Sequence, residues 1–331
     1  SPKMLERQSQ SESTVGETQV KVRITHVLLS AYDALAYTGA TKIVYPKTIG
    51  RIAIGLVTDS GENCYGVKKG ARVYMNAVRP CCKCYACKSG NKGECTSPLI
   101  AGQDFDGFLR DFVVCDYTEV TVLPDSVDDM LALCIENVAL AENIYDRLNL
   151  STGSRVAIVG GGFLGSILAQ IALYHKLVPI VIDNYTQNVE RLKKSGVFFT
   201  FAADDNLRQN IEDATSGSLC DAAVYTSCCK LTPSVPASVI ARKKDMVLGG
   251  FCTVNFSLDT APLFEKNLRV YSVSDGYGYI ETAINMLVHG AIDLSHFQKE
   301  ILKDFDPAAL LKDMADKATL DSKMTVLKLI L

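Results

Sequence analysis

Four cysteines in one short loop are the residues whose types and spacing point most directly to chemistry. The segment CCKCYACKSGNKGEC contains Cys81, Cys84, Cys87 and Cys95 in the pattern C-x2-C-x2-C-x7-C. Four thiolates close a tetrahedral zinc shell and leave no open position for water or substrate, which is the character of a structural site. An iron–sulfur cluster is the alternative group that four cysteines can hold, and the setting of the loop disfavours it. The sequence therefore predicts one structural zinc per chain.

The other cysteines show no metal-ligand spacing. Cys82 lies inside the loop but outside the pattern, and we expect it to be a bystander. Cys228 and Cys229 are adjacent, which is poor geometry for sharing a metal. Free cysteines of this kind are commonly small buried hydrophobic residues, and we expect this of Cys64, Cys115, Cys134, Cys220, Cys228, Cys229 and Cys252.

A second pattern, G-x-G-x-x-G, follows the strand-like run RVAIVGG. In a strand–turn–helix unit, the first glycine makes the tight turn, the second lets the backbone approach a pyrophosphate, and the third lets the helix pack on the strand. The free N–H groups and the dipole at the start of the helix then bind the phosphates. We predict that this dinucleotide-binding turn comprises Gly160, Gly162, Phe163, Leu164 and Gly165.

Asp183 ends the next strand-like run, 18 residues after Gly165. A carboxylate at this place accepts hydrogen bonds from the adenosine ribose hydroxyls and repels a 2′-phosphate. The residues that follow, Asn184, Tyr185 and Thr186, include no basic side chain. The sequence therefore favours NAD(H) over NADP(H). The alternative is a Rossmann-like fold with a surface aspartate and no cofactor.

Between about residues 20 and 150, short β-type runs alternate with turn residues. The runs are VKVRITHVLLS, RIAIGLVTDSG, ARVYMNAV and FLRDFVVCDYTEVTVLP. Alternating apolar and polar residues, punctuated by Gly, Asp and Pro, are typical of antiparallel strands. We predict an antiparallel, partly barrelled β unit over this region.

After about residue 150, strand-like and helix-like segments alternate, which indicates βαβ crossovers and a parallel sheet. The strand-like runs are SRVAIVGG, VPIVID, DAAVYTS and DMVLGGF, and the helix-like runs are FLGSILAQIALYHK and NVERLKKSG. Beyond about residue 275, IETAINMLVHGAI and DPAALLKDMADK have the pattern of amphipathic helices and MTVLKLIL that of a closing strand. The predicted fold class is α/β, with a doubly wound parallel sheet in the second region.

The composition disfavours several classes of partner. The 331 residues include 34 basic and 37 acidic side chains, a net charge of −3, without a basic block. Nucleic acid and anionic membranes are therefore not expected as partners. No run approaches the roughly 20 apolar residues of a membrane span, and the polar start, SPKMLERQSQSEST, lacks the apolar core of a signal peptide. Reduced thiols and a metal site are expected in such a chain, so we predict a cytoplasmic protein.

The four-cysteine loop, with the glycine motif about 65 residues after it, resembles the medium-chain dehydrogenase/reductase family of zinc alcohol and polyol dehydrogenases. The resemblance runs from about Val20 to Leu331. It implies a GroES-like catalytic domain over 1–150 with the zinc loop 81–95, a Rossmann NAD-binding domain over 151–274, and a return to the catalytic domain over 275–331. It also implies NAD(H)-dependent oxidoreductase activity on a small-molecule substrate, an active site in the cleft between the domains, and a homodimer or homotetramer.

This chain departs from the family at the positions that hold the catalytic zinc. Where zinc-dependent members have Cys-Gly-Ser/Thr-Asp, the chain has SAYD, so Ser30 replaces the cysteine, Tyr32 takes the hydroxyl position, and Asp33 is retained. Arg51 and Ile52 replace a His-Glu pair, and a further ligand position maps near Glu136. A guanidinium is cationic and has no free lone pair for Zn²⁺. The resemblance therefore predicts structural zinc without catalytic zinc.

Other side chains must then replace the metal that polarises the substrate in this family. We predict that Arg51 anchors an oxyanion or carboxylate, that Tyr32 exchanges the proton, and that Asp33 and Glu136 orient them or pair with Arg51. The substrate bond is a carbonyl or alcohol, or else a polarised C=C or C=N bond. Two alternatives stay open: Arg51 only pairs with Glu136 to fill the vacated site, and Tyr32 only packs.

Three further alternatives concern function. His26 lies near the SAYD segment and is a candidate to line the site. The chain is otherwise a zinc-dependent alcohol or polyol dehydrogenase with unusual ligands, or a catalytically silent NAD(H)-binding protein.

Overall fold

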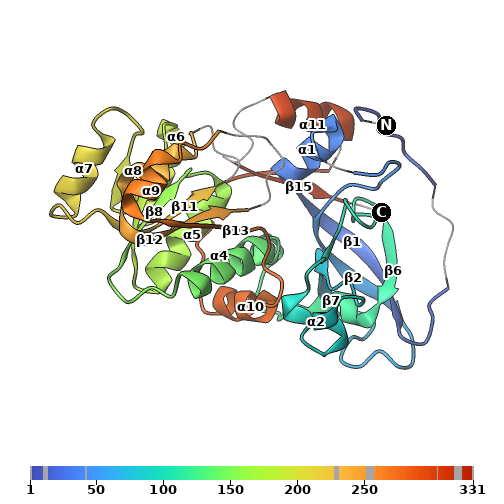
Figure 1. Ribbon diagram of the computed structural model, residues 1–331. Helices are drawn as coiled ribbons and strands as arrows, with labels where there is room; N and C mark the ends of the chain where they lie inside the picture. The colour runs from blue at the N-terminus through green and yellow to red at the C-terminus, as the bar shows by residue number, and fades with distance from the viewer. Residues whose placement is uncertain are drawn as a thin grey trace. The chain divides into compact units, whose positions relative to one another are not determined.

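A long strand, β1 (Gln19–Leu29), lies in the interior of a β-sheet in the computed structural model (Figure 1). β2 (Ile52–Ser60) pairs with it antiparallel along most of its length. On its other side, β6 (Phe112–Asp116) pairs with residues 19–23 and β15 (Lys323–Lys328) with residues 26–29, both antiparallel. Segments distant in sequence therefore meet on β1, which fixes the residues directly after it.

The structure describes residues 2–9, 14–41, 43–226, 231–250, 257–303, 305–316 and 323–329. The chain folds as two compact units. The first comprises Ser1–Glu136, Lys299–Leu320 and Met324–Leu331, and the second comprises Asn137–Gln298 and Asp321–Lys323.

The sheet of the first unit has the strand order β14-β15-β1-β2-β3-β7, with β6 also paired to β1. The strands not yet given are β3 (Arg72–Met75), β7 (Val120–Val122) and β14 (Gln298–Leu302), and β4 (Val78–Arg79) pairs with β5 (Leu99–Ile100) in a small separate sheet. The strand pairs that involve β1, β2, β3, β6 and β7 are antiparallel. The predicted antiparallel β unit is confirmed.

Helices interrupt this unit where only β-type runs were expected. α1 (Ala31–Thr38) is capped at its start by Ser30, directly after β1, and at its end by Gly39, whose φ of 80° is left-handed. Asp128 caps the start of α3 (Asp129–Ala132), and its side chain accepts hydrogen bonds from the N–H groups of Met130 and Leu131. α4 (Ile135–Leu148) follows α3. The remaining helices of the unit are α2 (Tyr85–Lys88), the 3₁₀ turns η1 (Lys92–Glu94) and η2 (Tyr117–Glu119), and α11 (Pro307–Asp316).

The second unit contains a sheet in the order β10-β9-β8-β11-β12-β13, in which every neighbouring pair is parallel. In chain order this is 3-2-1-4-5-6, the order of a dinucleotide-binding Rossmann sheet. The strands are β8 (Arg155–Val159), β9 (Val178–Ile182), β10 (Phe199–Phe201), β11 (Cys220–Thr226), β12 (Ile240–Gly249) and β13 (Arg269–Val273). The predicted α/β fold with a doubly wound parallel sheet is confirmed.

Helices connect these strands and cover the sheet. α5 (Phe163–Tyr174) packs on β8 and β9, and α8 (Ser234–Val239) packs on β8 and β11 (Figure 1). The other helices are α6 (Thr186–Lys194), α7 (Leu207–Ala214), α9 (Ala261–Lys266) and α10 (Ile280–Val288). β8 and β9 are buried over their last four residues, as a sheet covered on both faces requires.

Among the described residues, no helix has both the length and the apolar character needed to cross a membrane.

Candidate active site

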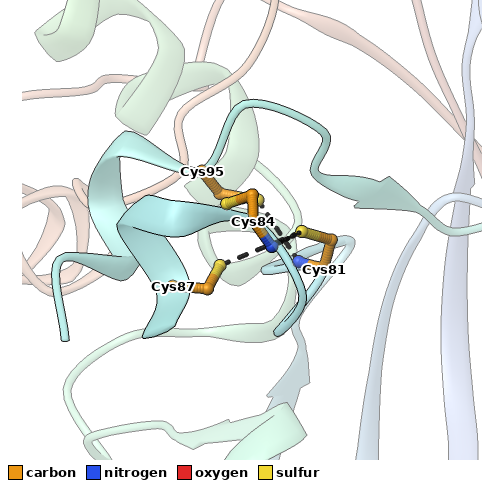
Figure 2. A group of neighbouring side chains, drawn as sticks. All are labelled: Cys81, Cys84, Cys87 and Cys95. Atoms are coloured by element: carbon orange, nitrogen blue, oxygen red, sulfur yellow. Dashed lines mark hydrogen bonds between the residues drawn. The ribbon is translucent and has the colours of Figure 1, made fainter. Parts of the chain in front are cut away.

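The four cysteines of the loop converge on one point (Figure 2). Cys84 caps the start of α2 and Cys87 lies within this helix, while Cys95 directly follows η1. The four sulfur atoms lie within 4.8 Å of one another, and the Cys81–Cys87 and Cys84–Cys95 sulfur pairs are each 4.0 Å apart. Sulfur atoms bound to a tetrahedral zinc at about 2.3 Å stand almost 4 Å from one another. The cluster fits a structural zinc.

Backbone N–H groups prepare this loop for thiolates. The Cys81 N–H donates to Cys95 Sγ at 3.2 Å, and the Cys84 N–H donates to Cys81 Sγ at 3.3 Å. The N–H groups of Cys87 and Thr96 lower the pKa of Cys84 to about 5. Because zinc binds the thiolate form, these N–H groups favour the metal-binding form of Cys84, whereas burial raises the pKa of Cys87 to about 12.

The cysteines outside the cluster differ in their surroundings. Cys82 is exposed and its S–H donates to the Pro80 carbonyl, as expected of a bystander. Cys115, Cys134 and Cys220 are buried as predicted, whereas Cys64 is only partly buried. Cys228, Cys229 and Cys252 lie outside the described residues.

The glycine motif forms the tight connection between β8 and α5. Gly160 has a φ of 99°, a conformation that side chains disfavour. Gly162 caps α5, so Phe163 and Leu164 lie in the first helical turn, where backbone N–H groups have no partner within the helix. A Cβ at Gly165 would overlap the Gly160 carbonyl oxygen. The tight turn at Gly160 and the close helix–strand packing at Gly165 are therefore present, and the approach of the Gly162 backbone to a pyrophosphate stays a prediction.

Asp183 lies directly after β9 and is buried, so it is not a surface aspartate. Its Oδ2 accepts hydrogen bonds from the Gly161 N–H at 2.6 Å and from Asn188 Nδ2 at 3.0 Å, and its Oδ1 accepts one from the Tyr185 N–H at 2.7 Å. The carboxylate thus lies beside the glycine turn, and its contact with an adenosine ribose stays a prediction.

Arg191 of α6 was not predicted to take part in this turn. Its side chain is buried, and Nη2 donates to the Gly161 carbonyl at 2.8 Å and to Ser166 Oγ at 3.1 Å. The guanidinium also stacks over the Phe297 ring, 5.0 Å from its centroid. The spacing from the glycine motif could not reveal this contact, because it depends on how α6 packs against the turn.

Arg51 and Glu136 form a buried ion pair in the first unit. Arg51 Nη2 lies 3.1 Å from Glu136 Oε1, and the two side chains are 7% and 6% exposed. Arg51 stands directly before β2 and Glu136 in the first turn of α4. Tyr74 of β3, which the sequence patterns did not single out, donates its O–H to Glu136 Oε2 at 3.0 Å. Of the two open interpretations of Arg51, the structure therefore contains the pairing with Glu136.

Tyr32 lies next to this pair. The Arg51 guanidinium carbon is 5.7 Å from the centroid of the Tyr32 ring. The Tyr32 O–H donates to Gln103 Oε1 at 3.0 Å, another contact that the sequence patterns did not indicate. Burial raises the pKa of Tyr32 above its ordinary value of 10.0, and the neighbouring Arg51 only partly opposes this shift. The phenol therefore keeps its proton at neutral pH.

Asp33 and Ser30 are engaged with the backbone and with each other. Asp33 Oδ2 accepts hydrogen bonds from the Ser30 N–H at 2.9 Å and from Ser30 Oγ at 2.8 Å. Its Oδ1 accepts one from the Gly50 N–H at 2.9 Å. Gly50 has a φ of 93°, and a Cβ there would stand 2.7 Å from the Leu109 nitrogen. Asp33 thus ties the start of α1 to the residue before Arg51, which positions Tyr32 and Arg51 relative to each other.

The histidine side chains described next contact residues other than Tyr32, Arg51 and Glu136. His26 Nδ1 lies 3.2 Å from Thr25 Oγ1 and 3.6 Å from Asp129 Oδ2. His175 Nε2 lies 2.6 Å from Glu142 Oε1, and His289 Nδ1 lies 2.8 Å from the Asn285 carbonyl. His296 borders a polar pocket of about 400 Å³ beside α6. Within the part of the chain that the structure describes, the four-cysteine loop is the only group of three or more His, Cys, Asp or Glu side chains arranged to hold a metal ion.

Comparison with known proteins shows similarity to alcohol and polyol dehydrogenases. The family model of the alcohol dehydrogenase GroES-like domain matches residues 16–125. The chain is 24% identical over 304 residues to an uncharacterized zinc-type alcohol dehydrogenase-like protein of Haemophilus influenzae, covering 91% of this chain and 89% of that protein. It is also 24% identical over 270 residues to sorbitol dehydrogenase of Halalkalibacterium halodurans, covering 80% and 78% of the two chains.

A solved structure shares the fold over nearly the whole length. It is that of an alcohol dehydrogenase (rspB) from E. coli CFT073 complexed with cofactor NADH, with a TM-score of 0.84, 22% identity, and coverage of 99% of this chain and 96% of that chain. This fold, the GroES-like domain match, the converging cysteines and the glycine turn agree with one another. Along most of its length the chain is therefore similar to medium-chain dehydrogenases/reductases, and its residues 16–125 match the GroES-like domain of alcohol dehydrogenases.

Proposed function

We propose that this chain is an NAD(H)-dependent oxidoreductase that transfers hydride to or from a small organic substrate without a catalytic zinc. The buried Arg51–Glu136 pair is the observation that carries the second half of this proposal. At the family's metal position the chain has a cation whose charge a carboxylate already balances, and a divalent ion beside it would meet repulsion. The structural zinc of the cysteine loop is separate from this chemistry, because four thiolates leave no open coordination position.

The cofactor half of the proposal rests on the glycine turn, on Asp183 and on the relatives. The alcohol dehydrogenase from E. coli with the same fold was solved with NADH. Asp183, without a basic residue directly after it, favours the free 2′-hydroxyl of NAD(H). When bound, the nicotinamide supplies or accepts the hydride. The protein must then orient the substrate and move a proton.

Arg51 and Tyr32 are the side chains that we assign to these two tasks. The Arg51 guanidinium stays charged and stabilises negative charge that develops on a substrate oxygen or nitrogen. Tyr32 keeps its proton because burial raises its pKa, so it can donate this proton to the reduced substrate and recover it in the reverse reaction. Asp33, Ser30 and Glu136 position these two residues.

The substrate is a carbonyl or alcohol compound, or one with a polarised C=C or C=N bond. The sorbitol dehydrogenase relative makes polyols and keto sugars the first compounds to test. We also propose a homodimer or homotetramer in the cytoplasm, on the family resemblance.

The proposal is tested by metal content and by isotope transfer. Purified chain should contain about one zinc ion, and NADH deuterated on one face of the nicotinamide should pass its label to a product from a panel of carbonyl, enone and imine compounds. Two zinc ions, with activity lost on chelation, would instead support a zinc-dependent enzyme with unusual ligands. Bound NADH without any transfer would support a catalytically silent protein.

Replacing Tyr32 by phenylalanine tests its role as proton donor. Loss of a general acid typically costs two or more orders of magnitude, so we expect Tyr32→Phe to lower kcat by about 100-fold, with NADH affinity unchanged. The matched control is Tyr45→Phe, which removes a hydroxyl that donates to the Ala36 carbonyl at 2.6 Å in the same unit. Equal kcat values for the Tyr32 and Tyr45 variants would remove Tyr32 from the mechanism.

A further inference from the structure

Tyr74 contacts the side chain that anchors Arg51. It lies in β3, is fully buried, and donates its O–H to Glu136 Oε2 at 3.0 Å. The other carboxylate oxygen, Oε1, receives Arg51 Nη2 at 3.1 Å. Each oxygen of Glu136 therefore has its own buried donor.

The strand around Tyr74 gives this hydroxyl a fixed position. β3 is paired on both sides, with Tyr74 opposite Ile54 of β2 and opposite Thr121 of β7. A central strand of this kind cannot shift without breaking two ladders, and a fully buried ring has no second rotamer to enter without displacing the core. Tyr74 thus presents its O–H to Glu136 from a rigid support.

The hydroxyl also remains a donor over the working range of pH. Burial, together with the neighbouring charge of Glu136, raises the pKa of Tyr74 well above its ordinary value of 10.0. A protonated phenol that donates to a carboxylate stabilises the charged form of that carboxylate. Arg51 therefore faces a counter-ion whose second oxygen is held in place by the Tyr74 hydroxyl.

We propose that Tyr74 is a positioning residue of the site: its hydroxyl occupies the second oxygen of Glu136, so that Glu136 acts as the anchor of Arg51 rather than as a base or a metal ligand. This inference rests on the proposed function and deepens it. Proton exchange with the substrate then falls to Tyr32, and the direction of the guanidinium depends on a residue that does not touch Arg51 by hydrogen bond.

A double-mutant cycle between Tyr74 and Arg51 tests this role. Tyr74→Phe removes only the hydroxyl, and Arg51→Lys keeps the charge but loses the planar fork that pairs with a carboxylate. We expect Tyr74→Phe to lower kcat about tenfold in the wild-type background and by about twofold or less in the Arg51→Lys background, with KM for the substrate little changed. An equal loss of kcat in both backgrounds would overturn the proposal, as would an unchanged kcat in folded Tyr74→Phe.

Tyr145→Phe is the matched control. Tyr145 is also buried, and its O–H donates to the Leu168 carbonyl at 2.8 Å in the other unit. Its effect on kcat should combine additively with that of Arg51→Lys, whereas that of Tyr74→Phe should not. If Tyr74→Phe does not fold, Tyr74→Met replaces it, since it also removes the hydroxyl and leaves an apolar side chain. The same smaller effect in the Arg51→Lys background is then expected.

The same cycle measured on urea unfolding separates this proposal from the proposed function. If wild-type chain transfers no hydride to any compound of the panel, the proposed function fails, yet the anchoring of Arg51 by Tyr74 still predicts non-additive changes in unfolding free energy. Additive changes there would overturn the positioning role whatever the activity.

Discussion

The cysteine loop and the Arg51–Glu136 cluster lie in the same folding unit and solve opposite electrostatic problems. The loop collects four sulfur donors with N–H groups behind them, and three of its four cysteines are only partly buried. The cluster combines a cation, a carboxylate and two phenols, and its ion pair is almost fully buried. Lone pairs without a counter-charge require an ion from outside, whereas the cluster contains its own neutralising partner. The comparison teaches that the cysteine loop needs an ion to balance its thiolates, whereas the Arg51–Glu136 pair is already balanced by its own two charges.

The difference predicts which site depends on metal. Cys84→Ser weakens one of four zinc ligands, and we expect the zinc content to fall from about one ion per chain to nearly none. The unfolding free energy should drop by about 5 kcal/mol or more, because structural zinc contributes its binding energy to folding. Elemental analysis and thermal unfolding measure the two effects.

Cys82→Ser is the control for this change, because Cys82 lies in the same loop but is exposed and outside the cluster. It should retain zinc and stability. Loss of zinc from both variants would mean that the loop is sensitive to any substitution, and the assignment of ligands would fail.

Breaking the Arg51–Glu136 pair should destabilise the chain in a different way, because it leaves a buried charge without a counter-ion. Glu136→Gln leaves Arg51 buried without its counter-ion, and we expect a loss of about 3 kcal/mol in unfolding free energy, with zinc content unchanged. The control is Glu212→Gln, which breaks the pair of Glu212 with Arg208 at 2.8 Å, whose side chains are 28% and 53% exposed. This pair should contribute about 1 kcal/mol or less, because water screens it. Similar losses from both variants would contradict the special status of the buried pair.

We expect the smallest effect on stability from substitution of His26, which also tests whether this residue takes part in the proposed active site. Burial lowers its pKa from the ordinary value of 6.5, although Asp129 opposes the shift. In the unfolded chain the same ring takes up a proton more readily, so acidification below about pH 6.5 favours unfolding until the folded form is also protonated. The stability that His26 contributes is thus present above pH 6.5 and lost as the pH falls.

His26→Gln should therefore flatten the decline in unfolding free energy between pH 7 and pH 5, as denaturant titrations at several pH values would measure. His289→Gln, at the exposed end of α10, serves as the surface control, and its change in stability should stay within about 0.5 kcal/mol. A loss of kcat in His26→Gln at constant stability would instead place His26 in the proposed active site.

Sequence reasoning succeeded where one local pattern determines the structure. The runs at β8 and β9 are buried on both faces, so continuous apolar residues indicated them, and the glycine turn between β8 and α5 follows from backbone constraints that three residues express. It missed α1, because Ser30 and Asp33 resemble the end of a strand until their hydrogen bonds define a helix start. It also missed the short edge strands β10 and β13, whose partly exposed residues lack a continuous apolar run.

The candidate site divides in the same way. Cys81, Cys84, Cys87 and Cys95 share one loop, so their spacing alone indicated a common ligand. Sequence spacing could not indicate Tyr74 and Gln103, because each contacts a partner that is distant in sequence. Strand pairing and loop packing bring the partners together. A buried tyrosine in a β-run has the same pattern as any core aromatic residue. Only its acceptor distinguishes it.

One carboxylate of the second unit carries a consequence for altering coenzyme preference. Asp183 Oδ2 accepts a hydrogen bond from the Gly161 N–H, so the residue that we propose to select between NAD(H) and NADP(H) also holds the glycine turn in place. Replacing Asp183 by a smaller neutral side chain to admit NADP(H) would also remove the acceptor for the Gly161 N–H and make the turn less ordered. A variant with altered coenzyme preference would therefore need a new acceptor for this N–H. Without one, we expect weaker binding of both dinucleotides.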